Sequence, residues 1–144
     1  MRALLDVNVL IALMDAGHVH HEMAMNWLEK NLSFGWASCP ITQNGCIRIM
    51  SQPNYPGALP VTQVADRLAE AVASVEHEFW PDSISLLDSN VFSWSKVLGH
   101  RQVTDIYLLT LAVQNGGRFV TLDRRIAFDS VKGASPTQLV HLQA

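Results

Sequence analysis

Short apolar runs alternate with longer amphipathic stretches along most of the chain, and this alternation predicts strands that are each followed by a helix. The expected strands lie at 3–7, 34–39, 84–87 and 118–123, with a closing strand inside 131–142. The expected helices lie within 8–15, 18–32, 41–52, 62–77, 89–100 and 104–115. Parallel strands need long crossover connections, which are usually helices packed on the sheet. The pattern therefore predicts an α/β fold, a three-layer α/β/α sandwich around a central, mainly parallel sheet.

Polar residues and helix breakers mark the boundaries of these elements. Asn8, Thr62 and Thr104 stand where three of the helices are expected to begin, and their side-chain oxygens suit the capping position. The eight residues 53–60 (PNYPGALP) contain three prolines and one glycine, which predicts a loop. We find no internal repeat and no linker. Residues 1–144 are therefore expected to form a single domain.

Composition narrows the class of protein. Hydrophobic residues make up 49% of the 144 residues and charged residues 16%, which is typical of a chain with a closed core. No apolar run is long enough to cross a membrane, and Asp6 and Asn8 interrupt the apolar start, so neither a membrane span nor a signal peptide is expected. Cys39 and Cys46 lack the spacing of a metal site, which favours a reducing, cytoplasmic location.

A net charge of −3 argues against a protein that coats nucleic acid by charge alone. Any contact with nucleic acid is therefore expected to come from a local basic patch. Arg101, Arg124 and Arg125 lie close in sequence to two aspartates and are candidates for this patch, although each also fits a solvated surface position.

Three aspartates are expected to meet at one edge of the sheet. Asp6 interrupts the apolar run LLDVNVLIAL at the end of the first strand, and Asp123 ends the strand RFVTLD. Asp105 lies in the first turn of a helix, where the helix dipole favours a carboxylate. The carboxyl ends of parallel strands line a ligand-binding crevice, and carboxylates gathered there repel one another unless a cation lies between them. We therefore predict a site for Mg²⁺ or Mn²⁺, although Asp6 alone also suits a turn or helix cap and Asp105 a helix start.

Three segments of the chain resemble the PIN-domain family, and within it the VapC-type toxins of toxin–antitoxin pairs. They are LLDVNVLIAL, CPITQNGCIRIMSQPNYPG and HRQVTDIYLLTLAVQNGGRFVTLDRRI, and the last is the most specific. The resemblance implies a parallel α/β/α sandwich and Mg²⁺- or Mn²⁺-dependent endonucleolytic cleavage of RNA. It also implies a small antitoxin protein as partner and a homodimer.

One position departs from the family pattern. The family carries a glutamate in a run resembling T-E-N-G, whereas this chain has Gln43 there. Glutamine keeps an oxygen that can contact a metal or its water, but it removes one negative charge, so a second ion is harder to retain. This departure leaves an alternative open, namely an attenuated PIN fold that binds RNA or antitoxin with little or no cleavage.

The resemblance assigns roles to the candidate residues. Asp6 and Asp105 are expected to bind the metal directly, and Asp123 to bind it through water or to orient the attacking water. With Gln43 they make up the expected catalytic set. Asn8 and Thr121 are expected to hold the carboxylates in place, although Asn8 also suits a helix cap and Thr121 an ordinary strand position.

Two other interpretations are weaker. His18, His20 and His21 crowd one connection, where zinc ligands would not converge, so solvated or helix-start positions are expected for them. A phosphoryl-transfer domain that uses an aspartyl phosphate needs a second acid beside Asp6 and a lysine at a strand end. Position 8 is asparagine, and no lysine lies where it would be needed.

Overall fold

A single parallel sheet forms the centre of the molecule. The computed structural model describes residues 1–143. Its five strands lie in the order β3-β2-β1-β4-β5, and every neighbouring pair is parallel. The strands are β1 (Ala3–Leu5), β2 (Trp36–Ser38), β3 (His77–Phe79), β4 (Arg118–Thr121) and β5 (Leu139–His141). The predicted α/β sandwich with a parallel sheet is confirmed.

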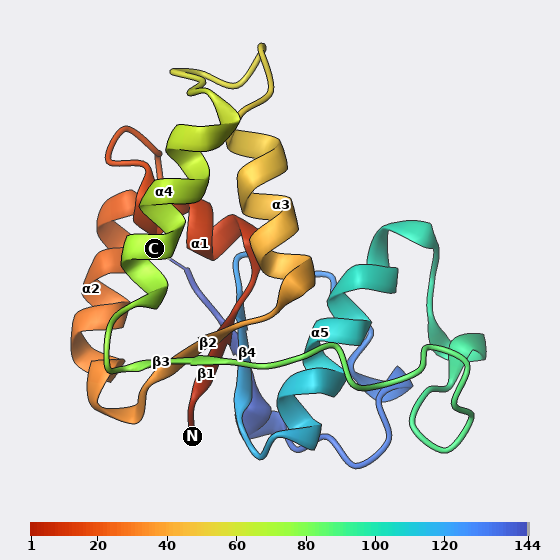
Figure 1. Ribbon diagram of the computed structural model, residues 1–144. Coiled ribbons are helices and arrows are strands. Elements are labelled where there is room, and N and C mark those ends of the chain that lie inside the picture. Colours follow the sequence, from red (N-terminus) through yellow and green to blue (C-terminus); the bar gives the residue numbers. More distant parts are fainter. Residues whose placement is uncertain (144) are drawn as a thin grey trace.

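Helices cover both faces of this sheet, as Figure 1 shows. One face carries α1 (Val7–Met14), α2 (His21–Asn31), α3 (Pro40–Met50) and α4 (Val61–Val72). The other face carries α5 (Val103–Gln114) and the irregular segment that precedes it. Short 3₁₀ helices lie at Leu32–Phe34, Trp94–Lys96, His100–Gln102, Phe128–Ser130 and Pro136–Gln138. Within residues 1–143, no helix combines the length and the apolar character that crossing a membrane requires.

The sheet separates two apolar cores because successive strand residues point to opposite faces. Leu4 and Phe119 contribute to the core under α5. Leu5 and Val120 contribute to the core under α1–α4. All four side chains are buried. This packing on both faces fixes β1 against β4 at the centre of the sheet, with Leu5 opposite Val120 in the register.

The segment between α4 and α5 differs from the prediction. The expected strand at 84–87 and helix at 89–100 are wrong, since this segment consists of turns and short 3₁₀ helices. The third strand is instead His77–Phe79, where the sequence predicted the end of a helix. As an edge strand that leaves Phe79 half exposed, it lacks the apolar pattern on which the prediction relied. Conversely, an apolar run does not guarantee burial, because Leu87 lies in such a run and is 90% exposed.

The predicted helix caps are also wrong. Asp6, rather than Asn8, occupies the N-cap of α1, and its carboxylate accepts a hydrogen bond from the Val7 N–H. Thr62 and Thr104 lie one residue inside their helices and make no capping bond. Helix α5 continues directly from the 3₁₀ turn at His100–Gln102, so the chain is already helical before Thr104.

Candidate active site at the carboxyl ends of β1 and β4

Asp6 is fixed between the two central strands. The chain order along the sheet reverses between β1 and β4, and this switch point is where open parallel sheets bind ligands. The Asp6 N–H donates to the Val120 carbonyl at 2.9 Å, so Asp6 continues the ladder between these strands. Its side chain is 5% exposed, with Oδ1 accepting from the Val7 N–H at 2.7 Å and Oδ2 from Thr121 Oγ1 at 2.6 Å.

Thr121 connects Asp6 to the end of β4. Its buried hydroxyl donates to Asp6 and also accepts a hydrogen bond from the Asp123 N–H at 3.0 Å. The Asp123 carboxylate in turn accepts from the Arg125 N–H at 2.8 Å, which shapes the turn after β4. One hydroxyl therefore sets the relative positions of two of the sequence-predicted aspartates.

The three aspartates act on one another electrostatically. Burial raises the pKa of Asp105 to about 7, and the negative charges of Asp6 and Asp123 add to this rise. Burial likewise raises the pKa of Asp6, against the opposing hydrogen bonds from Thr121 and Val7, and the charge of Asp123 adds to it. The structure thus brings the predicted acids into one region, where their ionised forms are mutually unfavourable.

The chemistry of these side chains fits a hard divalent cation. Such an ion prefers carboxylate oxygens, and its charge would offset the burial and the repulsion that together raise the pKa of Asp105. Within residues 1–143, however, no three acidic, histidine or cysteine side chains stand close enough together to enclose an ion as they are placed. Asp6, Asp105 and Asp123 are therefore coupled through their charges without forming a closed coordination shell.

Two other predicted site residues make different contacts. Asn8 Oδ1 accepts a long hydrogen bond of 3.4 Å from the Leu122 N–H, which links the start of α1 to the end of β4. Gln43, on the first turns of α3, donates through Nε2 to Ser38 Oγ at 3.0 Å. Ser38 Oγ is also paired with His77 Nε2 at 2.7 Å. The amide nitrogen of Gln43 is thus anchored to the end of β2.

A hollow of about 400 Å³ opens beside Asp6 and Asp105. Its walls include three side chains that the sequence analysis did not place at the site, namely His18, Arg48 and Tyr55. The Tyr55 hydroxyl donates to the Asp15 carboxylate, so a contact across 40 residues brings it there. Arg48 could have been found from the sequence, because it lies on the expected helix 41–52 that also carries Gln43.

The other two histidines lie at or near the start of α2. His20 occupies the N-cap position without a side-chain capping bond, and His21 Nδ1 lies 2.7 Å from the Ala12 carbonyl oxygen. These positions agree with the predicted helix-start role. The position of His18 in the wall of the hollow was not anticipated.

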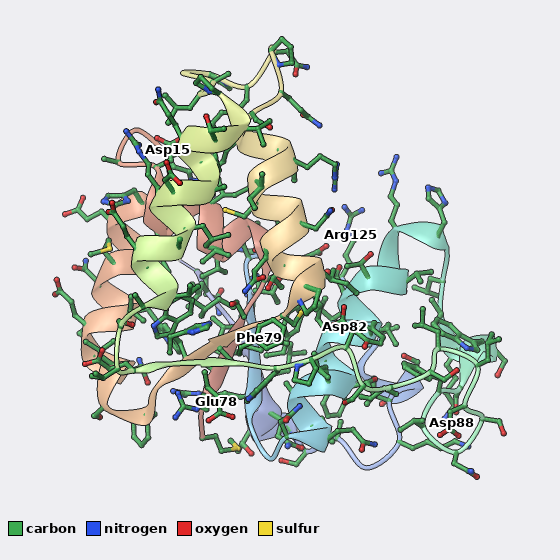
Figure 2. The ribbon with its side chains drawn as sticks, in the orientation of Figure 1. Asp15, Glu78, Phe79, Asp82, Asp88 and Arg125 are labelled. Carbon is green, nitrogen blue, oxygen red and sulfur yellow. The ribbon has the colours of Figure 1, made fainter. Side chains whose placement is uncertain are left out.

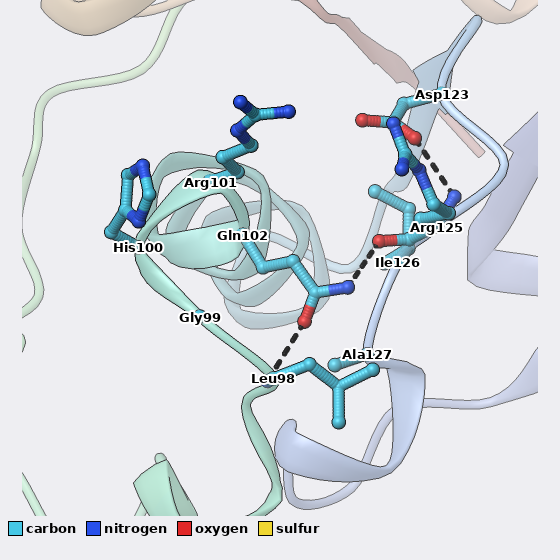
Figure 3. A pocket seen from close by; sticks show the side chains of 9 residues that line it. All are labelled: Leu98, Gly99, His100, Arg101, Gln102, Asp123, Arg125, Ile126 and Ala127. Atoms are coloured by element: carbon cyan, nitrogen blue, oxygen red, sulfur yellow. Dashed lines mark hydrogen bonds between the residues drawn. The ribbon is translucent and has the colours of Figure 1, made fainter.

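A second hollow, of about 570 Å³, opens on the Asp123 side. Arg101 and Arg125 line it, as Figure 3 shows, whereas Arg124 is exposed outside it. Figure 2 shows Arg125 near the beginning of α5 and Asp88 far from it on the irregular segment. The aspartates therefore lie between two hollows, each of which contains at least one arginine.

Comparison with known proteins identifies the family of this fold and site. A family model described as the PIN domain matches residues 3–134. The chain belongs to the PIN domain family. It is 51% identical to Ribonuclease VapC44 of Mycobacterium tuberculosis, over 99% of this chain and 100% of that protein. It is 42% identical to Ribonuclease VapC39 of the same organism, over 92% of this chain and 96% of that protein.

Two solved structures share the fold at low sequence identity. VapBC2 from Rickettsia felis, bound to a DNA fragment from its promoter, aligns with a TM-score of 0.66 and 15% identity over 99% of this chain and 100% of that chain. Mycobacterium tuberculosis VapC20, a Sarcin-Ricin loop cleaving toxin, aligns with a TM-score of 0.62 and 13% identity over 93% and 99%. These likenesses support the layered parallel-sheet architecture.

Proposed function

We propose that this PIN domain protein is a metal-dependent endoribonuclease and the toxin of a type II toxin–antitoxin pair. The observation that carries the proposal is that Asp6 and Asp105 line one hollow at the switch point of the sheet, while the Thr121 hydroxyl bonds to both Asp6 and the Asp123 N–H. The identity of 51% to a ribonuclease over the full length supports it. The same relatives give no support to an attenuated fold that only binds.

In this proposal Asp6 and Asp105 hold one Mg²⁺ or Mn²⁺ ion, with Asp123 bound through water. When bound, the ion supplies Lewis-acid chemistry, because it lowers the pKa of a water and neutralises charge that develops on the phosphate. Thr121 keeps the Asp6 carboxylate in a fixed orientation through its hydrogen bond. Asp123 orients the attacking water.

Other residues position the RNA and support the acids. Arg48 in one hollow and Arg101 and Arg125 in the other bind the phosphates on either side of the cleaved bond. Asn8 holds the turn after β4 through the Leu122 N–H. Gln43 Nε2 is bound to Ser38, so the remaining amide oxygen, Oε1, would be the atom of this side chain that can contact the metal or its water.

The partners in this proposal are RNA as substrate, a small antitoxin protein, and a second copy of the chain in a homodimer. The antitoxin proposal is supported by the relatives, which are VapC proteins, and by the structural neighbour, which is a VapBC protein. Size-exclusion chromatography with light scattering, on the chain alone and after co-expression with the product of an adjacent reading frame, tests both assemblies.

The test of the activity is cleavage of a structured RNA by the purified chain with Mg²⁺ or Mn²⁺. We expect cleavage that EDTA abolishes and that Asp6→Asn reduces by at least 100-fold, because the ion loses a charged ligand. The matched control is Asp66→Asn, which removes an equal charge from an exposed position on α4.

A second readout does not depend on turnover. Mn²⁺ should raise the melting temperature of the wild-type protein and of Asp66→Asn, but not that of Asp6→Asn, because ligands that bind the folded state stabilise it. Cleavage that persists in EDTA, or that survives Asp6→Asn, contradicts the proposal.

A further inference from the structure

Ser38, His77 and Gln43 form a hydrogen-bonded group, which we call the Ser38 network. The Ser38 hydroxyl oxygen lies 2.7 Å from His77 Nε2 and 3.0 Å from Gln43 Nε2. Ser38 and His77 belong to the neighbouring strands β2 and β3, whereas Gln43 lies in the first turns of α3. Because Ser38 is fully buried, its single hydroxyl proton must go to an acceptor within the protein. The choice of acceptor decides how the other two side chains can bond.

Two arrangements of protons satisfy the Ser38 network, and each selects one end of the Gln43 amide. If His77 Nε2 accepts the Ser38 proton, the Ser38 oxygen accepts from the Gln43 NH₂ group, and Oε1 stays free. If His77 Nε2 carries a proton instead, it donates to Ser38, which then donates to Oε1 and leaves the NH₂ group free. In the structure Gln43 Nε2 lies on Ser38, which corresponds to the first arrangement. That arrangement requires a neutral His77 with its proton on Nδ1.

The surroundings of His77 favour this neutral ring. Burial lowers the pKa of His77, and the positive charge of Arg2 adds to the effect. The backbone of Val72 and the charge of Glu78 oppose it without reversing it. The ring also packs against the Trp36 ring, with 4.5 Å between the two centroids. At neutral pH the imidazole is therefore uncharged and has one ring nitrogen available as an acceptor.

The Ser38 network lies next to the strand that carries Asp6. Strand β2 is the neighbour of β1, and Asp6 follows the last residue of β1 (Figure 1). Helix α3 packs so closely on α1 that a Cβ added at Gly45 would lie 2.7 Å from the side chain of Val7. Gln43 is two positions before Gly45 on the same helix. An amide has only one end that a cation accepts, so the orientation of Gln43 matters to any ion held there.

We propose that His77 is a positioning residue that acts through Ser38. By accepting the Ser38 proton, His77 holds the NH₂ end of Gln43 on Ser38 and leaves the oxygen end available to the cation or its water. Without His77, Ser38 can donate to Gln43 Oε1, and the amide then presents N–H groups that repel a cation. The proposal rests on the proposed ribonuclease function for its effect on cleavage, whereas the order of bonding within the Ser38 network does not depend on that function.

The first experiment measures which nitrogen of His77 carries the proton. Long-range ¹H–¹⁵N correlation spectra of the protein, recorded in EDTA above neutral pH, report this directly. The loss of one imidazole signal in His77→Phe assigns it. We expect a proton on Nδ1 and none on Nε2. In Gln43→Glu the new carboxylate can only accept from Ser38, so His77 Nε2 should become protonated.

Two controls separate hydrogen bonding from a general effect of charge. Gln63→Glu adds the same charge at an exposed position on α4 and should leave the proton of His77 on Nδ1. Ser38→Ala removes the link, so in that background Gln43→Glu should no longer move the proton. A proton on Nε2 in the wild-type protein, or a His77 signal that does not respond to Gln43→Glu, overturns the proposal.

The second experiment uses the difference between an amide and a carboxylate. His77→Phe keeps an aromatic ring against Trp36 but removes the acceptor. We expect it to raise the Mn²⁺ concentration that gives half-maximal cleavage by about 5- to 10-fold, the equivalent of one hydrogen bond. In the Gln43→Glu background the same substitution should have little effect, because both ends of a carboxylate are oxygens. A role of His77 in folding alone would change the Mn²⁺ requirement equally in both backgrounds.

The outcomes distinguish this proposal from the proposed function. If metal-dependent cleavage is found but His77→Phe acts equally in both backgrounds, the positioning role fails while the ribonuclease proposal stands. If the His77 proton responds to Gln43→Glu through Ser38 but no metal-dependent cleavage is found, the ribonuclease proposal fails while the Ser38 network still orients Gln43.

Discussion

Thr121 Oγ1 donates a hydrogen bond of 2.6 Å to Asp6 Oδ2, between residues that are 115 positions apart in the chain. The same oxygen accepts the Asp123 N–H, so its single proton is directed to Asp6. A buried threonine that donates to a buried carboxylate favours the ionised form of Asp6, against the effect of burial. This hydroxyl therefore orients Asp6 and partly offsets the cost of its charge.

Thr121→Val tests this role, because valine keeps the β-branched shape of the strand residue but lacks the hydroxyl. We expect a loss of stability of about 1–3 kcal/mol, since a hydrogen bond to a charged group is removed. We also expect at least a 10-fold loss of RNA cleavage. Urea denaturation and a cleavage assay under identical conditions measure the two effects.

The control for this substitution is Thr110→Val. Thr110 is also fully buried, but its hydroxyl donates to the Ile106 carbonyl within α5. The Thr110→Val substitution should lower the stability of the protein without a comparable loss of cleavage per folded molecule. Equal losses of cleavage in the two variants would show that Thr121 has no special effect on Asp6.

Stability in the absence of divalent ions should depend on pH through Asp105. Its pKa rises from an ordinary value of 3.8 to about 7 on folding, so the folded state binds the proton more tightly. This contribution is fully present below about pH 4 and is lost as pH rises toward 7. In EDTA, Asp105→Asn should therefore lose less stability than the wild type between pH 4 and pH 8. An equal change in stability between pH 4 and pH 8 for the two proteins, measured by urea denaturation, would contradict the raised pKa of Asp105.

Gln43→Glu should strengthen the binding of the metal ion. The substitution adds a fourth negative charge at the position where the family carries a glutamate, while the loss of the amide nitrogen removes the donor to Ser38. We expect the Mn²⁺ concentration that gives half-maximal cleavage to fall several-fold. Gln63→Glu adds the same charge at an exposed position on α4 and should have no effect. A rise in the required Mn²⁺ concentration would instead assign the main role of Gln43 to its bond with Ser38.

Gly45 sets how closely α3 approaches α1. A Cβ added there would lie 2.7 Å from Val7 Cγ2, which is closer than packed atoms allow. Gly45→Ala should lower the free energy of unfolding by about 1–2 kcal/mol, because overpacking costs more than the gain of about 1 kcal/mol in helix propensity. Cleavage should also fall, since Val7 directly follows Asp6.

The clash predicts a specific rescue. In the Gly45→Ala background, Val7→Ala should be less destabilising than it is alone, because it removes the methyl groups that collide. Gly17→Ala is the control, since its Cβ would meet only the Asp15 side chain at an ordinary 3.4 Å. Additive effects in the double variant, measured by urea denaturation, would exclude the contact.

The sheet was largely predictable because its central strands are apolar on both faces. Residues 3–5 and 118–121 form β1 and β4 inside the predicted ranges, with α-helices in each connection from β1 through β4. The edge strand His77–Phe79 escaped prediction because it is partly exposed. Leu86 and Leu87 show the opposite case, since they are apolar but exposed, and the strand predicted there is absent. Hydrophobicity along the sequence does not show which apolar residues tertiary packing leaves uncovered.

The residues of the candidate site also divide into those that the sequence predicts and those that it does not. Strand ends and a helix start place Asp6, Asp123 and Asp105, so topology alone brings them to one edge. Contacts between loops place Tyr55 and Gln102, whose hydrogen-bond partners lie 40 and 23 residues away along the chain. No local pattern in the sequence encodes such contacts, so they could not be predicted from it.

The walls of the hollow beside Asp123 come from the segment before α5 and from the turn after β4, both outside the regular strands. Surface segments of this kind tolerate changes in length and composition better than a sheet does. Under the proposed function, related proteins can therefore differ in the RNA that they recognise while they keep the same acidic residues at the strand ends. Exchanging only these two segments between such relatives is expected to exchange which RNA is cut.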